Sequence, residues 1–215
     1  MNDKKTYSCS ALHNSLYLAP DELRHCCKRF YVDGKMKGDV KIFPVTKSTD
    51  INAKNIIKAK KKLYDEINSG EKETPCTGCP YLVKDNWPSL EKLEIKHLSI
   101  ESHSVCSMKC TYCNETYYGG KKANYNLEEI LKNLIESKSI SKELSVAWGG
   151  GEPVLLDNFD KIFEMVNEKM KPYSTMVYTN AIKYNKYIEK YLKSGKVKIT
   201  TSIDAGTKET FKKIR

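Results

Sequence analysis

From residue 94 to residue 215, stretches with the apolar pattern of strands alternate with stretches that have the apolar spacing of amphipathic helices. This alternation predicts right-handed parallel βαβ units, so the expected fold class is α/β. In such folds the side chains that carry chemistry gather in the loops that follow the carboxyl ends of the strands. The expected strands are residues 98–101, 144–148, 175–178 and 197–203, and the expected helices begin at Asn126, Phe159, Ile182 and Thr207.

The first 93 residues have a different pattern. Residues 30–43, with an Asp33-Gly34 pair between two apolar stretches, indicate a β-hairpin. Residues 50–68 have the spacing of an amphipathic helix, and a cysteine pair follows them at Cys76 and Cys79. The change of pattern predicts two domains: a small cysteine-rich α+β domain stapled by a metal, residues 1–93, and an α/β domain, residues 94–215.

Composition limits the classes of partner. The 215 residues carry a formal net charge of +10, but only three of the 37 basic residues are arginine, and the lysines are dispersed. Dispersed lysine is typical of a solvated surface, so nucleic acid is not the expected partner, although the lysine-rich run at 58–62 could contact an anionic substrate or carrier. No apolar stretch approaches the roughly 20 residues of a membrane helix, and the amino terminus lacks the apolar run of a secretory signal. We therefore expect a cytoplasmic protein that does not bind membranes.

Eight cysteines are many for a cytoplasmic chain, where disulfides are rare and clustered cysteines are more often metal ligands or catalytic groups. Cys106, Cys110 and Cys113 have the spacing C-x3-C-x2-C, directly after the first expected strand of the α/β domain. Three thiolates in one loop can hold three irons of a 4Fe-4S cluster and leave the fourth iron open, whereas ordinary electron-transfer clusters use four cysteines. A zinc site with His97 or His103 as its fourth ligand is the alternative.

A glycine motif, Gly149-Gly150-Gly151-Glu152, ends the second expected strand and is followed by proline. Glycines at this position let the backbone approach a ligand closely and expose its carbonyl groups, and the glutamate adds a negative charge. This combination suits the ammonium group of a ligand. The alternative is a tight turn between strand and helix that binds nothing.

Together these motifs resemble the signature of the radical S-adenosylmethionine (radical SAM) superfamily, over about residues 94–215. The cysteine loop has Tyr112 before its last cysteine, the glycine motif follows the second strand, and Asn180 follows the third. The fourth strand, with Ser202 and Asp204 behind it, resembles the family's fourth βα unit. The resemblance implies a partial (β/α)6 TIM-like barrel, here truncated after its fourth strand, that binds a 4Fe-4S cluster and S-adenosyl-L-methionine.

The resemblance also implies a reaction. The reduced cluster cleaves S-adenosyl-L-methionine to methionine and a 5′-deoxyadenosyl radical, which abstracts hydrogen from a substrate, and an electron donor such as flavodoxin or ferredoxin reduces the cluster. Asp204 either belongs to the cofactor site or only caps the following helix. The implied cofactor contacts are Gly149, Gly150, Gly151 and Glu152 for the ammonium, Asn180, Ser202 and Arg215 for the carboxylate or ribose, and Tyr112 for the adenine side.

The cysteines of residues 1–93 form a second candidate metal site. Cys26 and Cys27 precede the expected hairpin, and Cys76 and Cys79 follow the expected helix. This arrangement loosely resembles the auxiliary-cluster domain called SPASM, or its shorter twitch relative, although those domains normally follow the barrel. It predicts a second iron–sulfur cluster or a zinc ion. Because adjacent cysteines rarely both bind one metal, Cys9 is a candidate to replace one of Cys26 and Cys27. Buried thiols without a metal are the remaining alternative.

The predicted function is radical chemistry on an unidentified substrate, with peptides, proteins and small metabolites all open. Two other classes are a non-catalytic zinc protein whose lysines bind nucleic acid, and an electron-transfer protein with clusters but no cofactor site; the glycine motif argues against the latter. With four strands expected where the family uses six, we also expect this chain to be a fragment. Its last strand would leave an unpaired edge, so we expect oligomers or poor solubility, and weak cofactor binding.

Overall fold

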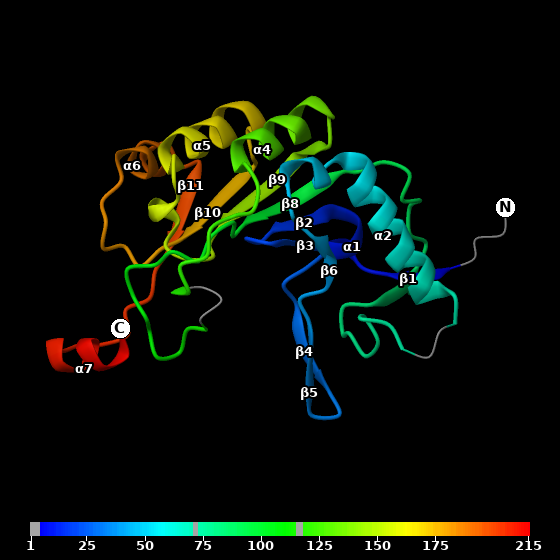
Figure 1. Cartoon of the computed structure of the whole chain (residues 1–215), viewed down its shortest axis with the longest axis horizontal. Helices are drawn as coiled ribbons and strands as arrows, with labels where there is room; N and C mark the ends of the chain where they lie inside the picture. Colours follow the sequence, from blue (N-terminus) through cyan, green and yellow to red (C-terminus); the bar gives the residue numbers. More distant parts are fainter. Residues whose placement is uncertain (1–4, 71–72, 115–117) are drawn as a thin grey trace.

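One mixed sheet organises the molecule in the computed structural model, which describes residues 5–70, 73–114 and 118–215. Within these residues, seven strands follow the order β11-β10-β9-β8-β2-β3-β6 (Figure 1). Neighbours from β2 to β11 are parallel, whereas β3 pairs antiparallel with both β2 and β6. The strands are β2 (Ser15–Leu18), β3 (Glu22–Arg24), β6 (Lys41–Pro44), β8 (Ile95–Ile100), β9 (Ile140–Trp148), β10 (Ser174–Tyr178) and β11 (Val197–Thr200).

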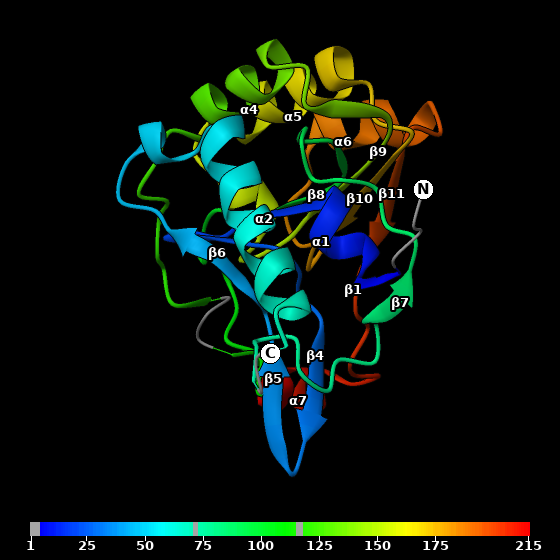
Figure 2. The same ribbon diagram turned by 90° about the vertical axis from the view of Figure 1, so that its right-hand side faces the viewer.

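The helices that connect the parallel strands cover one face of this sheet, as two perpendicular views show (Figure 1, Figure 2). They are α4 (Leu127–Glu136), α5 (Phe159–Met165), which continues as a π-helical turn over Val166–Met170, and α6 (Lys186–Lys193). In the core between helices and sheet, the fully buried Trp148 packs on Phe159 and Phe163, with ring centroids 5.3 and 5.5 Å away. The predicted α/β class is confirmed. Within the described ranges, no helix is long and apolar enough to cross a membrane.

All four strands expected after residue 94 are present as β8 to β11. β11 ends at Thr200 rather than at the expected Ile203, whose side chain is 91% exposed. The chain leaves the sheet here because residues 202 and 204 turn toward the last helix and bind Arg215. That helix, α7 (Lys208–Ile214), lies beyond the carboxyl ends of the strands, apart from the layer formed by α4, α5 and α6 (Figure 1).

Capping side chains decide where the helices begin. Asn126 and Thr207 cap α4 and α7 as expected, each accepting a hydrogen bond from the backbone N–H three residues further on. The helix expected from Ile182 begins at Lys186 instead. Asn185 is its cap, because its side-chain oxygen accepts from two backbone N–H groups of the first turn, at 3.0 Å each. The residues before it are therefore free to form a loop at the end of β10.

The predicted hairpin is confirmed, but it is shorter than expected. β4 (Arg29–Val32) pairs antiparallel with β5 (Lys35–Gly38) around Asp33 and Gly34, whose φ angles are +49° and +74°. Positive φ at both turn residues is the type I′ geometry that Asp-Gly pairs favour. The chain then turns back, and β6 joins the main sheet. The other elements of this part are β1 (Thr6–Ser8), α1 (Ser10–Asn14), α2 (Ala53–Asn68), which confirms the expected helix, and β7 (Val83–Asp85), paired with β1.

The main sheet runs through the predicted boundary at residue 93. β2 pairs in parallel with β8, with Leu16 opposite Leu98 and Leu18 opposite Ile100. These four side chains are buried in one continuous apolar core. The division into domains at residue 93 stays a prediction, but the two parts share a sheet and a core, so residues 1–93 are not a separate appendage.

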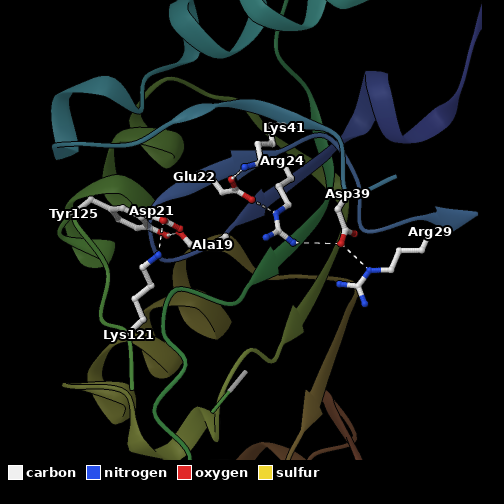
Figure 3. A network of polar contacts seen from close by, with 9 residues as sticks. All are labelled: Ala19, Asp21, Glu22, Arg24, Arg29, Asp39, Lys41, Lys121 and Tyr125. Carbon is white, nitrogen blue, oxygen red and sulfur yellow. Dashed lines mark hydrogen bonds and ion pairs between the residues drawn. The ribbon is translucent and has the colours of Figure 1, made fainter. Parts of the chain in front are cut away.

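Polar contacts also tie the two parts together (Figure 3). Between β3 and the start of α4, Lys121 forms an ion pair with Asp21 at 2.5 Å, and the hydroxyl of Tyr125 donates to the carbonyl of Ala19 at 2.9 Å. Within the first 93 residues, carboxylates alternate with basic groups along the neighbouring strands, with separations from 2.5 to 3.8 Å: Lys41, Glu22, Arg24, Asp39 and Arg29. This chain of charges fixes the hairpin against the sheet edge.

Candidate cofactor site

A cavity of about 190 Å³ lies at the carboxyl ends of the parallel strands and collects most of the predicted cofactor residues. The cysteine loop follows β8, the glycine motif follows β9, and further loops follow β10 and β11. Because parallel strands end at the same edge of the sheet, segments that lie far apart in the sequence meet here, such as Met108 and Arg215, 107 residues apart. The predicted residues that line the cavity are Cys106, Cys110, Tyr112, Cys113, Gly150, Gly151, Glu152, Asn180, Ser202 and Arg215.

The three cysteines of the loop face this one cavity as free thiols. A backbone hydrogen bond of 2.9 Å from the N–H of Cys113 to the carbonyl of Cys110 closes the loop, and Thr111 N–H donates to Ile214 of α7 at 2.8 Å. Burial raises the pKa of Cys113, and the neighbouring thiols of Cys110 and Cys106 raise it further. Deprotonated sulfurs this close repel one another, so positively charged irons bound between them would stabilise the arrangement. The donor set fits an iron–sulfur cluster.

The glycine motif packs so closely against the segment before the cysteine loop that side chains would not fit at Gly150 and Gly151. A Cβ atom on Gly151 would lie 2.2 Å from the carbonyl oxygen of Val105, and one on Gly150 would lie 2.6 Å from that of His103. Gly150 also has a φ of +87°. The N–H of Gly151 and that of Glu152 donate to these two carbonyls at 2.9 and 2.8 Å. The motif therefore sets the position of the cysteine loop, a role beyond the ligand contact and the simple turn considered above.

Gly151→Ala is expected to lower the free energy of unfolding by about 1–3 kcal/mol or more, because the added methyl group meets rigid backbone. Gly206→Ala is the matched control, since a Cβ atom there meets nothing within 4 Å. Urea denaturation of both variants measures the difference. Equal stability of the two variants would contradict the proposed contact.

Glu152 is buried, and its carboxylate holds the loop after β10. One oxygen accepts from the hydroxyl of Thr179 at 2.6 Å, and the other accepts from the backbone N–H of Asn180 at 2.8 Å. The side chain of Asn180 in turn donates to the hydroxyl of Ser107 at 3.2 Å and lies 4.0 Å from the sulfur of Cys106. Glu152 thus links the glycine motif to the cysteine loop through Asn180. Its assignment to the ligand ammonium stays a prediction.

Arg215 reaches back from the end of α7 into the cavity. Its guanidinium forms an ion pair with Asp204 at 2.5 Å, donates to the carbonyl of Ser202 at 2.6 Å and approaches the sulfur of Cys110 at 3.5 Å. The Nε atom is buried, and no described residue accepts its hydrogen. A buried donor without an acceptor is costly, so this atom suits an anionic group of a ligand.

Asp204 does not cap α7, which Thr207 does. It instead joins two predicted site residues, accepting from the Tyr112 hydroxyl at 2.7 Å while pairing with Arg215. Partial burial and this hydrogen bond raise the pKa of Tyr112 to about 12, so the phenol stays protonated at neutral pH. The guanidinium carbon of Arg215 lies 5.9 Å from the centre of the Tyr112 ring. The helix-cap alternative for Asp204 is therefore wrong, and its assignment to the cofactor site stays a prediction.

Five residues that line the cavity were not among the predicted site residues: Met108, Tyr178, Thr179, Thr200 and Thr201. Of these, Thr179 binds Glu152, and the sulfur of Met108 lies 3.6 Å from the Arg215 guanidinium. Thr179 directly precedes Asn180 at the end of a strand, and this position could have identified it as a site residue. Gly149 lies beside Glu101, outside the lining of the cavity. The predicted residues Cys26, Cys27, Cys76 and Cys79 line a different cavity, together with Cys9.

A family model described as the Radical SAM superfamily matches residues 100–215. Among curated relatives, a GTP 3',8-cyclase of Clostridium botulinum (strain Hall) is 27% identical over 124 residues, which cover 56% of this chain and 39% of the relative. A GTP 3',8-cyclase of Mannheimia succiniciproducens is 29% identical over 115 residues, which cover 52% and 34%. The chain thus spans about two fifths of the length of these relatives or less. No solved structure matches it significantly.

Proposed function

The chain belongs to the radical SAM superfamily and is an enzyme of that class, and from this premise we propose that S-adenosyl-L-methionine binds in the cavity at the ends of β8 to β11. The observation that carries the proposal is the shared cavity: three thiols, the glycine motif and a buried guanidinium with a free donor line the same 190 Å³ space. The chemistry that the bound cluster and cofactor supply is one-electron cleavage of the sulfonium, giving methionine and a 5′-deoxyadenosyl radical that takes hydrogen from the substrate.

The predicted residues of the cofactor site then have distinct roles. Cys106, Cys110 and Cys113 would hold three irons of the cluster, and the fourth iron would be open to the cofactor. The Nε atom of Arg215 donates to the carboxylate, and Asp204 keeps the guanidinium in place through the 2.5 Å ion pair. The backbone carbonyls of the glycine motif receive the ammonium, as the family resemblance implies.

The substrate does not follow from the relatives' names. GTP is the substrate that their names print, but the similarity covers at most about two fifths of their length, so the rest of those proteins has no counterpart in the comparison. We propose radical chemistry without assigning GTP, and peptides, proteins and small metabolites all stay open as substrates.

An electron donor is also required, and we propose a flavodoxin or ferredoxin. All eight cysteines are free thiols, which supports a reducing, cytoplasmic location. The lysines form ion pairs at many separate points of the surface, among them Lys96 with Glu143 and Lys190 with Glu164. This dispersed pattern supports the expectation that neither nucleic acid nor a membrane is the partner.

Arg215→Gln tests the cofactor assignment. We expect the variant to bind S-adenosyl-L-methionine about 10 to 100 times more weakly, because a charge-assisted hydrogen bond contributes about 1.5–3 kcal/mol. Calorimetric titration of the anaerobically reconstituted protein measures the affinity, and iron content should stay unchanged. Arg29→Gln is the control, since Arg29 lies in the hairpin and does not line the cavity. Equal affinity of the two variants would rule out the proposed contact.

A further inference from the structure

A second cavity, of about 530 Å³, collects thiols from three separate parts of the first 93 residues. Cys9 caps α1, and its sulfur accepts from the N–H of Leu12 at 3.4 Å. Cys26 lies between β3 and β4, and Cys76 and Cys79 follow α2. The apolar side chains of Leu12, Val40 and Leu63 pack against Cys9, Cys26 and Cys76. Five cysteines, Cys27 among them, therefore line one largely apolar cavity.

Cys76 and Cys79 lie in one hydrogen-bonded turn, and both line this cavity. The N–H of Cys79 donates to the carbonyl of Cys76 at 3.0 Å, and Thr74 and Thr77 brace the turn with a 2.8 Å hydrogen bond. Gly78 has a φ of +80°, and a Cβ atom there would lie 2.5 Å from the side chain of Val32. The turn is thus seated on the β4–β5 hairpin, and glycine is required at its centre.

The structure distinguishes Cys27 from the other four thiols. Cys27 is exposed and forms a hydrogen bond with the side chain of Tyr17. By contrast, Cys9, Cys26, Cys76 and Cys79 are half-buried, and the first three pack against the apolar cluster of Leu12, Val40 and Leu63. Cys9 therefore replaces Cys27 among the four candidate ligands. This agrees with the expectation that the adjacent Cys26 and Cys27 do not both bind one metal.

Lys60 is a buried basic group beside this cavity. Its side chain is fully buried, and its amino group donates to the carbonyls of Leu12 and Ser15, at 2.8 Å each. Within the described ranges, no carboxylate forms an ion pair with it. The titratable groups that face it are the thiols of Cys9 and Cys26 and the rings of His13 and His25. Burial lowers the pKa of Lys60, because a buried ammonium is costly without a compensating anion. Metal-bound thiolates beside it would supply that anion.

We propose that Cys9, Cys26, Cys76 and Cys79 bind one iron–sulfur cluster, separate from the cofactor site, with Lys60 as the neighbouring cation. A cluster fits better than one zinc ion, because no three His, Cys, Asp or Glu side chains in the described ranges lie close enough to share a single ion. In a 4Fe-4S cluster each thiolate binds a different iron, so the sulfurs lie further apart. Four thiolates leave no open iron, so the site serves electron transfer or structure rather than cofactor cleavage.

The proposal does not depend on the cofactor site, and metal analysis separates the two. After anaerobic reconstitution with ferrous iron and sulfide, we expect about eight irons per chain, since each 4Fe-4S cluster adds four. The double variant Cys76→Ser, Cys79→Ser should fall to about four irons per chain, and Cys27→Ser should keep about eight.

If the double variant does not fold, removing the ligands of the cofactor site instead isolates the second cluster. The triple variant Cys106→Ala, Cys110→Ala, Cys113→Ala should still hold about four irons and show the electron paramagnetic resonance signal of a reduced 4Fe-4S cluster. In that variant Lys60→Met should shift the reduction potential to a more negative value, because a nearby positive charge favours the reduced state. A triple variant without iron, or one that holds zinc after reconstitution, would overturn the proposal.

Discussion

Replacing Cys106, Cys110 and Cys113 by alanine together is expected to abolish cleavage of S-adenosyl-L-methionine and to remove about four irons per chain. All three thiols line the cavity at the ends of the parallel strands, and in the described ranges no other thiol lines it. Without them no iron can be held beside the glycine motif and Arg215. The loop itself should persist, because Thr111 and Ile214 anchor it by a backbone hydrogen bond of 2.8 Å.

Iron, sulfide and 5′-deoxyadenosine are measured on the wild type and the triple variant after identical anaerobic reconstitution. Cys27→Ala serves as the control for loss of an exposed thiol outside this site. A triple variant that kept its full iron content and still cleaved the cofactor would contradict the assignment of these ligands.

Glu152→Ala should lower the free energy of unfolding by about 2–4 kcal/mol and weaken cofactor binding. The substitution leaves the Thr179 hydroxyl and the Asn180 N–H without their buried acceptor, and each unsatisfied group costs about 1–3 kcal/mol. Because Asn180 also contacts the cysteine loop through Ser107, losing its position disturbs the cluster ligands. Denaturant unfolding and calorimetric titration measure the two effects.

Two variants control for the loss of charge. Glu152→Gln keeps the shape but replaces one acceptor oxygen by a donor, so its stability should lie between those of the wild type and Glu152→Ala. Glu143→Ala removes an exposed carboxylate that pairs with Lys96, and should change stability by less than about 1 kcal/mol. If Glu152→Ala were as stable as Glu143→Ala, the carboxylate would have no positioning role.

The part of the fold after residue 94 was predictable because local patterns specify it. Each strand there is a short apolar run, each helix has a 3.6-residue period, and Asn126 and Thr207 are strong caps. The cysteine spacing and the glycine motif have fixed places relative to those strands. These features depend on residues that are close in the sequence, so they can be predicted from the sequence alone.

The partnership between residues 1–93 and the main sheet was not predictable in this way. β2 is only four residues long, and its partner β8 lies about 80 residues further on, so the pairing depends on tertiary contacts. Lys60 illustrates the same limit. It belongs to a lysine-rich run that suggested a solvated surface, yet its side chain is fully buried against the carbonyls of α1. Helical phase places Lys60 on the same face as Ile56 and Leu63, but the lysine-rich composition of the run indicated a solvated surface.

Within the site, sequence motifs identified the residues but not their partners. The ion pair between Arg215 and Asp204, and the hydrogen bond from Tyr112 to Asp204, join loops that follow different strands. Likewise, the choice of Cys9 over Cys27 depends on the exposure of Cys27 and on its hydrogen bond with Tyr17. Such contacts exist only once the strands are in register.

The central claim is that this chain uses its three-cysteine loop to cleave S-adenosyl-L-methionine. The most direct test incubates the anaerobically reconstituted protein with the cofactor and a strong one-electron reductant, and quantifies 5′-deoxyadenosine and methionine by mass spectrometry. Both products are expected in equal amounts, at a rate above that of the triple cysteine variant even if cofactor binding is weak. Iron-loaded protein that binds the cofactor but yields no more 5′-deoxyadenosine than the triple variant would contradict it.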